Sequence, residues 1–198
     1  MKSIGFKEWA LVCQALGSGE QCIILRKGGI AEGRRGFSFQ FEEFYLFPTF
    51  FHEQLAHVRA IGRSLPVENG QVKIEYYARV ERALRIDSLV MAEALAPLHI
   101  LSANLVRERF EHASSGIEVA LVRIFALAQP WILANDKRFG GCRSWVELPT
   151  VPETSLRPVL SEEEHAVRRQ RFQAIVSGPS PLPRITLPAQ GPCVRHPD

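Results

Sequence analysis

CIILRKGGI at residues 22–30 and GFSFQFEEFYLFPTFFHEQ at residues 36–54 decide how this chain folds. The first run is apolar and rich in β-branched side chains, and residues 36–41 alternate aromatic with polar side chains. Both patterns are typical of β-strands, and the glycine-rich loop between them predicts a hairpin. A third short strand is expected over residues 44–47, and Pro48 is expected to end it.

Two longer strands are expected downstream. Residues 71–81 alternate regularly between apolar and polar side chains, with Tyr76 turned inward and Tyr77 turned outward. Residues 116–127 are apolar on both faces, which is typical of a central strand covered on both sides, and Pro130 is expected to stop it. The two patterns predict a sheet whose centre is buried.

Helices are expected around this sheet. Apolar residues at three- and four-residue spacing predict a helix over residues 6–16. Serine is a preferred N-cap residue, and Ser102 and Ser161 each precede a helical pattern; Glu164 completes a capping box with Ser161. The other expected elements are a helix beginning near residue 49, a helix over residues 87–95 and a short strand over residues 144–148. The predicted fold class is α+β, with a mainly antiparallel, twisted sheet or small barrel surrounded by helices.

The composition is that of an ordinary globular protein. The chain has 198 residues, of which 46% are hydrophobic and 23% are charged, and its net charge of +3 neither requires nor excludes nucleic acid as a partner. One domain is expected at residues 1–176, and the proline-rich residues 177–198 are expected to form a disordered tail. The sequence has no CxxC motif and no apolar run typical of a signal peptide or membrane span, so a cytoplasmic protein without a zinc knuckle is expected.

A cluster of positive charge follows the first strand. Arg26, Lys27, Arg34 and Arg35 surround a glycine-rich loop, whose backbone N–H groups can turn toward an anion. The glycine spacing resembles a Walker A loop, but Arg34 and Arg35 occupy the place of its Lys-Ser/Thr pair, so a nucleotide P-loop is not expected. The four side chains are candidate ligands of nucleic-acid phosphates; the alternative is a solvated hairpin loop.

A second cluster contains acids and histidines. His52, Glu53 and His57 form His-Glu-x3-His, which is one residue longer than the HExxH of zinc proteases and argues against such a site. A divalent metal could still be held by Glu43, His52 and Glu53, with His52 or Glu53 as general base and Lys27 stabilising the developing charge. The alternative is that these residues are ordinary surface acids and hydrogen-bonded histidines.

Aromatic and basic residues also occur together elsewhere. Tyr45 and Trp145 are candidates for stacking on nucleic-acid bases. NDKRFGGCRSW at residues 135–145 is a second candidate basic and aromatic surface. Arg123 lies within the apolar run and is expected to form a buried ion pair; the alternative is that it belongs to a functional site.

Several motifs resemble one protein family. EWALVCQAL, LRKGGI and FxLxPTxxHEQ within residues 8–54, followed by VRERF and GGCRSWVEL, are similar to an uncharacterised bacterial family, domain of unknown function 1802. The resemblance covers residues 6–150 and implies no established activity. The layout of strands and helices is also similar to that of PUA-like barrels, including the ASCH and EVE groups. That likeness implies a small barrel and a role in binding RNA or modified bases.

Three functions are compatible with these patterns. The first is a nucleic-acid or nucleotide-binding domain that uses Arg26, Lys27, Arg34, Arg35, Tyr45 and Trp145. The second is a metal-dependent hydrolase or nuclease with its site at residues 26–57 and a divalent metal as its cofactor. The patterns therefore leave open whether the protein is an enzyme. The third is a non-catalytic scaffold that captures partner proteins through residues 177–198. A membrane is not an expected partner.

Overall fold

A long antiparallel pair of strands, β4 (Gln71–Ile86) and β5 (Ile117–Ala134), lies at the centre of the structure. The computed structural model describes residues 3–27, 37–50, 52–59, 64–65, 70–112, 114–150 and 152–178. The other elements are β1 (Ile4–Trp9), α1 (Ala10–Gly17), β2 (Ile23–Arg26), β3 (Glu43–Thr49), the 3-10 helix η2 (His52–His57), α2 (Leu89–Ala94), η3 (Ala96–Leu98), α3 (Ala103–Glu111), η4 (Lys137–Phe139), β6 (Trp145–Glu147), β7 (Leu156–Pro158) and α4 (Glu162–Val176).

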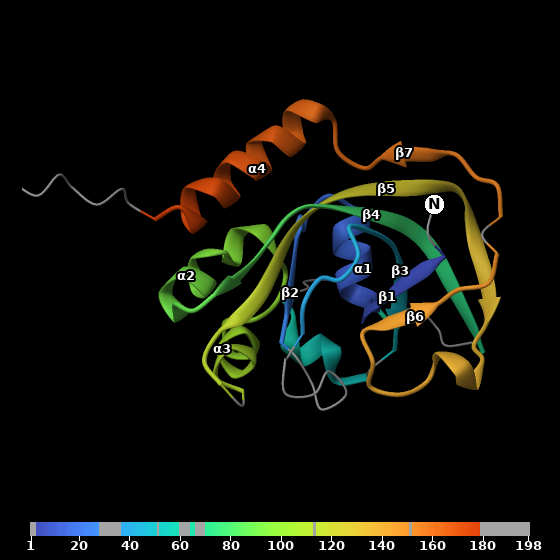
Figure 1. Cartoon of the computed structure of the whole chain (residues 1–198), viewed down its shortest axis with the longest axis horizontal. Helices are drawn as coiled ribbons and strands as arrows, with labels where there is room; N and C mark the ends of the chain where they lie inside the picture. The colour runs from blue at the N-terminus through green and yellow to red at the C-terminus, as the bar shows by residue number, and fades with distance from the viewer. Residues whose placement is uncertain are drawn as a thin grey trace, which may run out of the picture.

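The strands form one twisted sheet in the order β2-β5-β4-β3-β1-β6, and β7 pairs with β5 (Figure 1). Strands β1 and β3 run parallel, and the other described pairs are antiparallel. The sheet does not close into a barrel, so β2 and β6 are the ends of the strand order. The predicted α+β fold with a mainly antiparallel, twisted sheet is confirmed.

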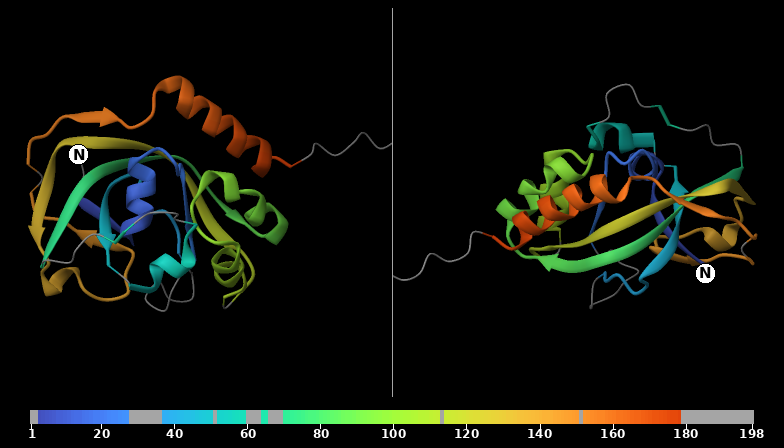
Figure 2. Two further views of the ribbon diagram at one scale, coloured as in Figure 1. Left: turned by 180° about the vertical axis from the view of Figure 1, so that it is seen from behind. Right: turned by 90° about the horizontal axis from the view of Figure 1, so that it is seen from above.

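The sheet curls around helix α1, which lies on its concave side (Figures 1 and 2). Most residues of α1 are buried, and they join the larger hydrophobic core with side chains from β2 and β5. The curl brings the two ends of the sheet near each other. At the end of β2, Arg26 donates a hydrogen bond from Nη2 to Oγ of Ser144, directly before β6, over 3.3 Å.

An irregularity in the ladder between β4 and β5 changes which tyrosine is buried. The register shifts between Ile74 and Tyr76, so the alternation of side chains reverses there. Tyr77 is 1% exposed and belongs to a second core cluster with Ile74 and Trp131, while Tyr76 is partly buried against the cluster around α1. The predicted outward position of Tyr77 is therefore wrong, because the alternation does not continue across this irregularity in the ladder.

The start of the chain differs from the helix predicted over residues 6–16. Residues Ile4–Trp9 form β1, between β3 and β6, and α1 begins at Ala10. Phe6, Trp9 and Cys13 have helical spacing, but Phe6 is held in the sheet and is fully buried. Pairing with strands on both sides outweighs the local periodicity.

Residues 37–41 form no strand, so the hairpin predicted between them and β2 is wrong; β2 pairs with β5 instead. The Phe37 ring lies 6.0 Å from the Phe6 ring and 6.3 Å from the Trp145 ring, measured between centroids. The alternating aromatic side chains therefore fill the space between the two sheet ends. Their pattern reflects packing of an extended segment and not strand pairing.

Strand β5 continues through Pro130, which was expected to stop it. The pairing with β4 is interrupted there, because Ala126 lies opposite Tyr76 and Trp131 lies opposite Ile74. Proline has no N–H group, and an irregularity in the ladder is one of the few places in a sheet that accepts it. The ladder resumes at Trp131 and extends the strand to Ala134.

Helix α4 packs across the sheet near β5 (Figure 1). Its predicted capping box is present, since Ser161 Oγ accepts from the Glu164 N–H and the Glu164 carboxylate accepts from the Ser161 N–H. Arg123 forms an ion pair, with Nη2 3.3 Å from Oε2 of Glu162, but the pair is not buried as predicted, because the Glu162 side chain is 68% exposed. Ser102 caps α3 as predicted.

Residues 179–198 lie outside the described residues, so the disordered tail stays a prediction. No helix in the described ranges is long and apolar enough to cross a membrane.

Candidate functional site

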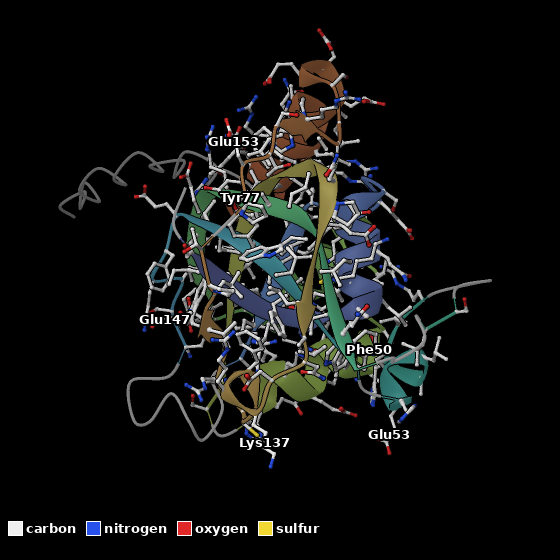
Figure 3. The ribbon with its side chains drawn as sticks, turned by 90° about the vertical axis from the view of Figure 1, so that its right-hand side faces the viewer. Phe50, Glu53, Tyr77, Lys137, Glu147 and Glu153 are labelled. Atoms are coloured by element: carbon white, nitrogen blue, oxygen red, sulfur yellow. The ribbon has the colours of Figure 1, made fainter. Side chains whose placement is uncertain are left out.

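A pocket of about 720 Å³ opens along strand β6, and we call it the β6 groove. The extended segment after residue 36, the loop around η4 and β6 itself form its walls. Its lining residues are Ile4, Gln40, Phe41, Arg138, Arg143, Trp145, Val146, Glu147, Leu148 and Pro149. Figure 3 shows Glu147 at the left of the view and Lys137, the neighbour of Arg138, at the bottom.

The backbone of β6 contributes polar groups to this groove. The Lys7 N–H donates to the Ser144 carbonyl and the Leu148 N–H donates to the Ser3 carbonyl, each over 2.8 Å. In an antiparallel ladder, hydrogen-bonded residue pairs alternate with non-hydrogen-bonded pairs. Ser144 and Leu148 bond to β1, so the N–H and C=O groups of Trp145 and Glu147 point away from β1. Among the described strands none pairs with this edge, which leaves donors and acceptors facing the groove.

The aromatic wall of the groove is rigid. The Trp145 ring is half-buried and meets the Phe41 ring edge-on at 5.0 Å between centroids. It also contacts Phe6 at 4.8 Å and Phe44 at 5.2 Å, and both of these rings are fully buried. The part of Trp145 that lines the groove is therefore fixed by the core behind it, as a stacking surface requires.

Two arginines lie on the rim. The side chain of Arg138 is 60% exposed, stacks over the Phe139 ring at 4.8 Å and is 3.8 Å from a carboxylate oxygen of Asp136. The Arg143 guanidinium donates to the carbonyls of Gly140 and Arg138, each over 3.4 Å. Within the described part of the chain Arg143 has no carboxylate partner at ion-pair distance. The rim therefore carries positive charge that the protein only partly neutralises.

Beyond Ser144 the groove meets a second group of charged residues, Lys7, Glu8, Arg26 and Arg109, which we call the basic corner. Glu8 is 1% exposed, and its Oε1 accepts a hydrogen bond from the Trp9 N–H over 2.8 Å. Arg26 Nη1 lies 3.7 Å from the same oxygen, and the Arg26 guanidinium covers the Phe6 ring at 5.3 Å. Of the three cations, Arg26 is thus the one at ion-pair distance from the buried carboxylate among the described contacts.

The other two cations of the basic corner are also withdrawn from water. Lys7 is buried and donates from Nζ to the Gly141 carbonyl over 3.0 Å; burial, with the positive charges of Arg143 and Arg26, lowers its pKa. Arg109 donates to the Leu25 carbonyl over 2.9 Å. Burial lowers the pKa of Arg109 to about 10, and the charge of Arg26 adds to this effect. Both shifts reflect positive charge held in a poorly solvated place.

Several residues predicted from the sequence have other roles. Lys27 donates from Nζ to the carbonyls of Phe110, Ser114 and Gly116, so it holds the loop after α3 and does not face the groove. Arg34 and Arg35 lie outside the described residues. The placement of Arg26 beside the groove agrees with its predicted role, which stays a prediction.

Tyr45 does not fit its predicted role in stacking on bases. It is fully buried, and its ring lies 5.0 Å from Tyr77 and 5.7 Å from Trp131 in the second core cluster. An aromatic side chain must be accessible on one face to stack on a ligand. Trp145, which lines the groove, keeps its predicted role as a proposal.

The predicted metal ligands do not come together. Glu43 accepts a hydrogen bond from Arg79 over 2.8 Å, which lowers the pKa of the carboxyl. The Glu43 carboxylate lies close to Tyr77, and Figure 3 shows Tyr77 in the upper part of the view and Glu53 at its lower right. His52 and Glu53 are exposed on η2. Among the described residues no group of three His, Cys, Asp or Glu side chains could hold a metal.

The PTxxHEQ motif has a structural role instead. Thr49 donates from Oγ1 to the Glu8 carbonyl over 3.1 Å, and the fully buried Gln54 accepts from the Leu11 N–H over 3.0 Å. The His57 ring lies 5.9 Å from the Trp9 ring. These contacts fix the junction between β1 and α1 and thereby position the basic corner.

Sequence reasoning missed most of the basic corner. Lys7 and Glu8 fall within the helix predicted over residues 6–16, but the structure places them in β1, and Arg109 was not singled out. Gln40 and Phe41 were assigned to a strand. A usable signal was the charge of residues 135–145, which did identify the stretch containing Arg138 and Arg143 as a basic surface.

These features define a class of protein: an α+β domain with a basic, aromatic-lined groove at the open edge of a curled sheet. The chain belongs to the family described as Domain of unknown function (DUF1802), whose sequence model matches residues 5–171. The family resemblance of the motifs is thus confirmed. No curated protein matches the chain.

The fold is similar to solved structures of an ASCH protein from Zymomonas mobilis. One structure has 16% sequence identity and a TM-score of 0.47, and the match covers 86% of this chain and 93% of that chain. Two mutants of the same protein match with 14% and 16% identity and the same TM-score, over 85% and 86% of this chain and 95% and 98% of theirs. ASCH is one of the two groups that the order of strands and helices in the sequence was said to resemble.

Proposed function

We propose that the protein binds single-stranded nucleic acid or nucleotides in the β6 groove. One observation carries the proposal: two basic stretches that are far apart in sequence meet beside an aromatic wall. Arg26 donates a hydrogen bond to Ser144, which is 118 residues later in the sequence. Ser144 directly follows Arg143, which lies on the rim of the groove. Clustered positive charge interleaved with aromatic rings is the combination that holds phosphates and stacks bases.

The groove suits an unpaired nucleotide in size and chemistry. Its volume of about 720 Å³ lies within the range usual for small-ligand pockets. Phe41 and Trp145 supply ring surfaces on one wall, and Arg138 and Arg143 supply charge on the rim. The backbone groups of Trp145 and Glu147, which are unpaired among the described strands, and the Gln40 amide are donors and acceptors for a base edge. Base edges and ring faces are accessible together only when the base is unpaired.

The metal-dependent hydrolase has no comparable support. Its proposed charge-stabilising residue, Lys27, is occupied by backbone carbonyls, Glu43 is bonded to Arg79, and no group of three metal ligands forms among the described residues. We therefore assign no reaction to the site. Partner capture by residues 177–198 stays a prediction.

A binding assay tests the proposal. Fluorescence anisotropy with a single-stranded RNA, a structured RNA and a DNA duplex should show the tightest binding for the single strand. The double variant Arg138→Ala/Arg143→Ala should bind it about 10-fold or more weakly, since each charged phosphate contact contributes roughly 1 kcal/mol. The double variant Arg157→Ala/Arg171→Ala removes two exposed arginines from β7 and α4, away from the groove, and should change affinity less than twofold. Equal loss in both variants, or preference for the duplex, would contradict the proposal.

A further inference from the structure

Among the described residues that line the β6 groove, one carries a carboxylate. Glu147 lies two residues after Trp145 in β6, and the residue between them, Val146, is 4% exposed and packs into the second core cluster. Successive side chains of a strand point to opposite faces, so Trp145 and Glu147 share the other face. Their positions are roughly 6.6 Å apart along the strand, so a base that stacks on the Trp145 ring can bring its edge to the Glu147 carboxylate.

The Glu147 carboxylate is not neutralised by the arginines of the groove. Its side chain is exposed, and among the described residues the carboxylate makes no hydrogen bond and no ion pair, although Arg138 and Arg143 line the same pocket. Arg138 is instead 3.8 Å from a carboxylate oxygen of Asp136, and Arg143 donates to the carbonyls of Gly140 and Arg138. Both oxygens of Glu147 are therefore available to a ligand.

A negative charge in this groove restricts what can face it. A carboxylate repels phosphates, but it accepts hydrogen bonds from the N–H groups on the edge of a base. If the arginines on the rim hold the phosphates, Glu147 must face the base. The N–H groups of Trp145 and Glu147 point away from β1 and have no partner among the described strands. The edge of β6 thus presents two adjacent acceptors from one side chain beside a backbone donor.

Guanine is the base whose edge matches this pattern. Its Watson–Crick edge has two adjacent donors, N1–H and the N2 amino group, followed by the O6 acceptor. Adenine and cytosine each place a ring-nitrogen acceptor beside their amino group, and uracil places its N–H group between two carbonyls. These acceptors repel a carboxylate, so the other bases cannot use both of its oxygens through adjacent donors.

We propose that Glu147 makes the β6 groove selective for an unpaired guanine, which donates two hydrogen bonds to the carboxylate. The O6 atom of the same base accepts from a backbone N–H of β6, and its ring stacks on Trp145. This inference rests on the proposed function, because it names the base that the groove takes. The groove then divides its tasks: Arg138 and Arg143 provide affinity for any strand, and Glu147 provides the preference between bases.

The test uses a short, uridine-rich single-stranded RNA whose central nucleotide is guanosine, adenosine, cytidine, uridine or inosine. Fluorescence anisotropy with the full chain should show about 10-fold or tighter binding of the guanosine probe than of the other three natural probes, because a bidentate contact to a base edge discriminates by about this factor. Inosine keeps N1–H and O6 but lacks the N2 amino group. Its probe should bind about threefold or more weakly than the guanosine probe.

A matched pair of variants assigns the preference to one side chain. Glu147→Gln keeps the size of the side chain but replaces one acceptor with a donor, so the preference for guanosine should fall to threefold or less. Loss of charge alone would tighten every probe by the same factor, and therefore the ratio between probes is the deciding quantity. Glu153→Gln changes an exposed glutamate that does not line the groove, labelled in the upper part of Figure 3, and should leave the ratio unchanged. Thermal unfolding shows whether both variants are folded.

The outcomes separate this inference from the proposed function. If all probes bind the wild type equally and Arg138→Ala/Arg143→Ala weakens them together, the guanine preference is overturned while the proposed function stands. A guanosine preference that persists in Glu147→Gln would overturn the role of Glu147. If no probe binds, the proposed function fails and the inference fails with it.

Discussion

At the scale of single residues, the sequence did not predict which partner each charged side chain binds. Lys27 and Arg26 are neighbours in one basic stretch, yet Lys27 binds backbone carbonyls behind α3 while Arg26 reaches Ser144 and Glu8. Tyr45 belongs to the same aromatic stretch as Phe41, yet it is buried and Phe41 lines the groove. The sequence shows where charges and rings concentrate, and strand register then decides which of them face a ligand.

His99 gives a prediction about pH. It is buried, and burial lowers its pKa to about 3, with the charges of Arg59 and Arg109 adding to the shift. A histidine whose folded-state pKa lies below its unfolded value of about 6.5 stabilises the fold above pH 6.5, and that stability is lost as the pH falls toward 3. His99 should therefore contribute a slope of up to about 1.4 kcal/mol per pH unit in this window.

The variant His99→Gln removes this titration. Chemical denaturation between pH 7 and 4 should show a flatter dependence of the free energy of unfolding on pH than in the wild type. His112→Gln changes an exposed histidine at the end of α3 and should leave the slope as it is. Parallel curves for the wild type and His99→Gln would show that His99 does not stay neutral in the folded protein.

At the scale of elements, the junction of β1 and α1 depends on a residue from η2. Gln54 accepts from the N–H of Leu11 in the first turn of α1, where no side-chain cap is present. Gln54→Leu should lower the free energy of unfolding by about 1–3 kcal/mol, because a buried N–H loses its acceptor. Urea denaturation measures the loss. Gln170→Leu, at an exposed position of α4, should change stability by less than about 0.5 kcal/mol.

Helix α4 tests a feature that was predicted correctly from sequence. Replacing Ser161 with Ala removes the hydroxyl that accepts from the Glu164 N–H over 3.2 Å. The expected loss is about 1 kcal/mol in thermal or chemical unfolding, which is typical of an N-cap serine. Glu163→Ala in the same first turn removes a charge but no capping bond, so it should cost less. A loss from Ser161→Ala no larger than that from Glu163→Ala would mean that the cap does not anchor the helix.

At the scale of the whole molecule, local patterns predicted the fold class and long-range geometry required the structure. Capping signals and the family motifs depend on neighbours in sequence, and they were predicted correctly, as was the existence of a strand over residues 71–81. The β1 strand, the irregularity at Ile74 and the contact between Arg26 and Ser144 depend on segments far apart in sequence. The groove exists because the sheet curls without closing, and periodicity in a single segment carries no information about that curl.

The central claim is that the β6 groove binds single-stranded nucleic acid through Arg26, Arg138 and Arg143. The most direct measurement is single-strand affinity at about 50 and 200 mM salt for the wild type and for Arg138→Ala/Arg143→Ala. Three phosphate contacts predict an affinity decrease of about 20-fold between these salts in the wild type, and one remaining contact predicts about threefold in the variant. Equal salt dependence in the two proteins, or no measurable affinity in either, would contradict the account.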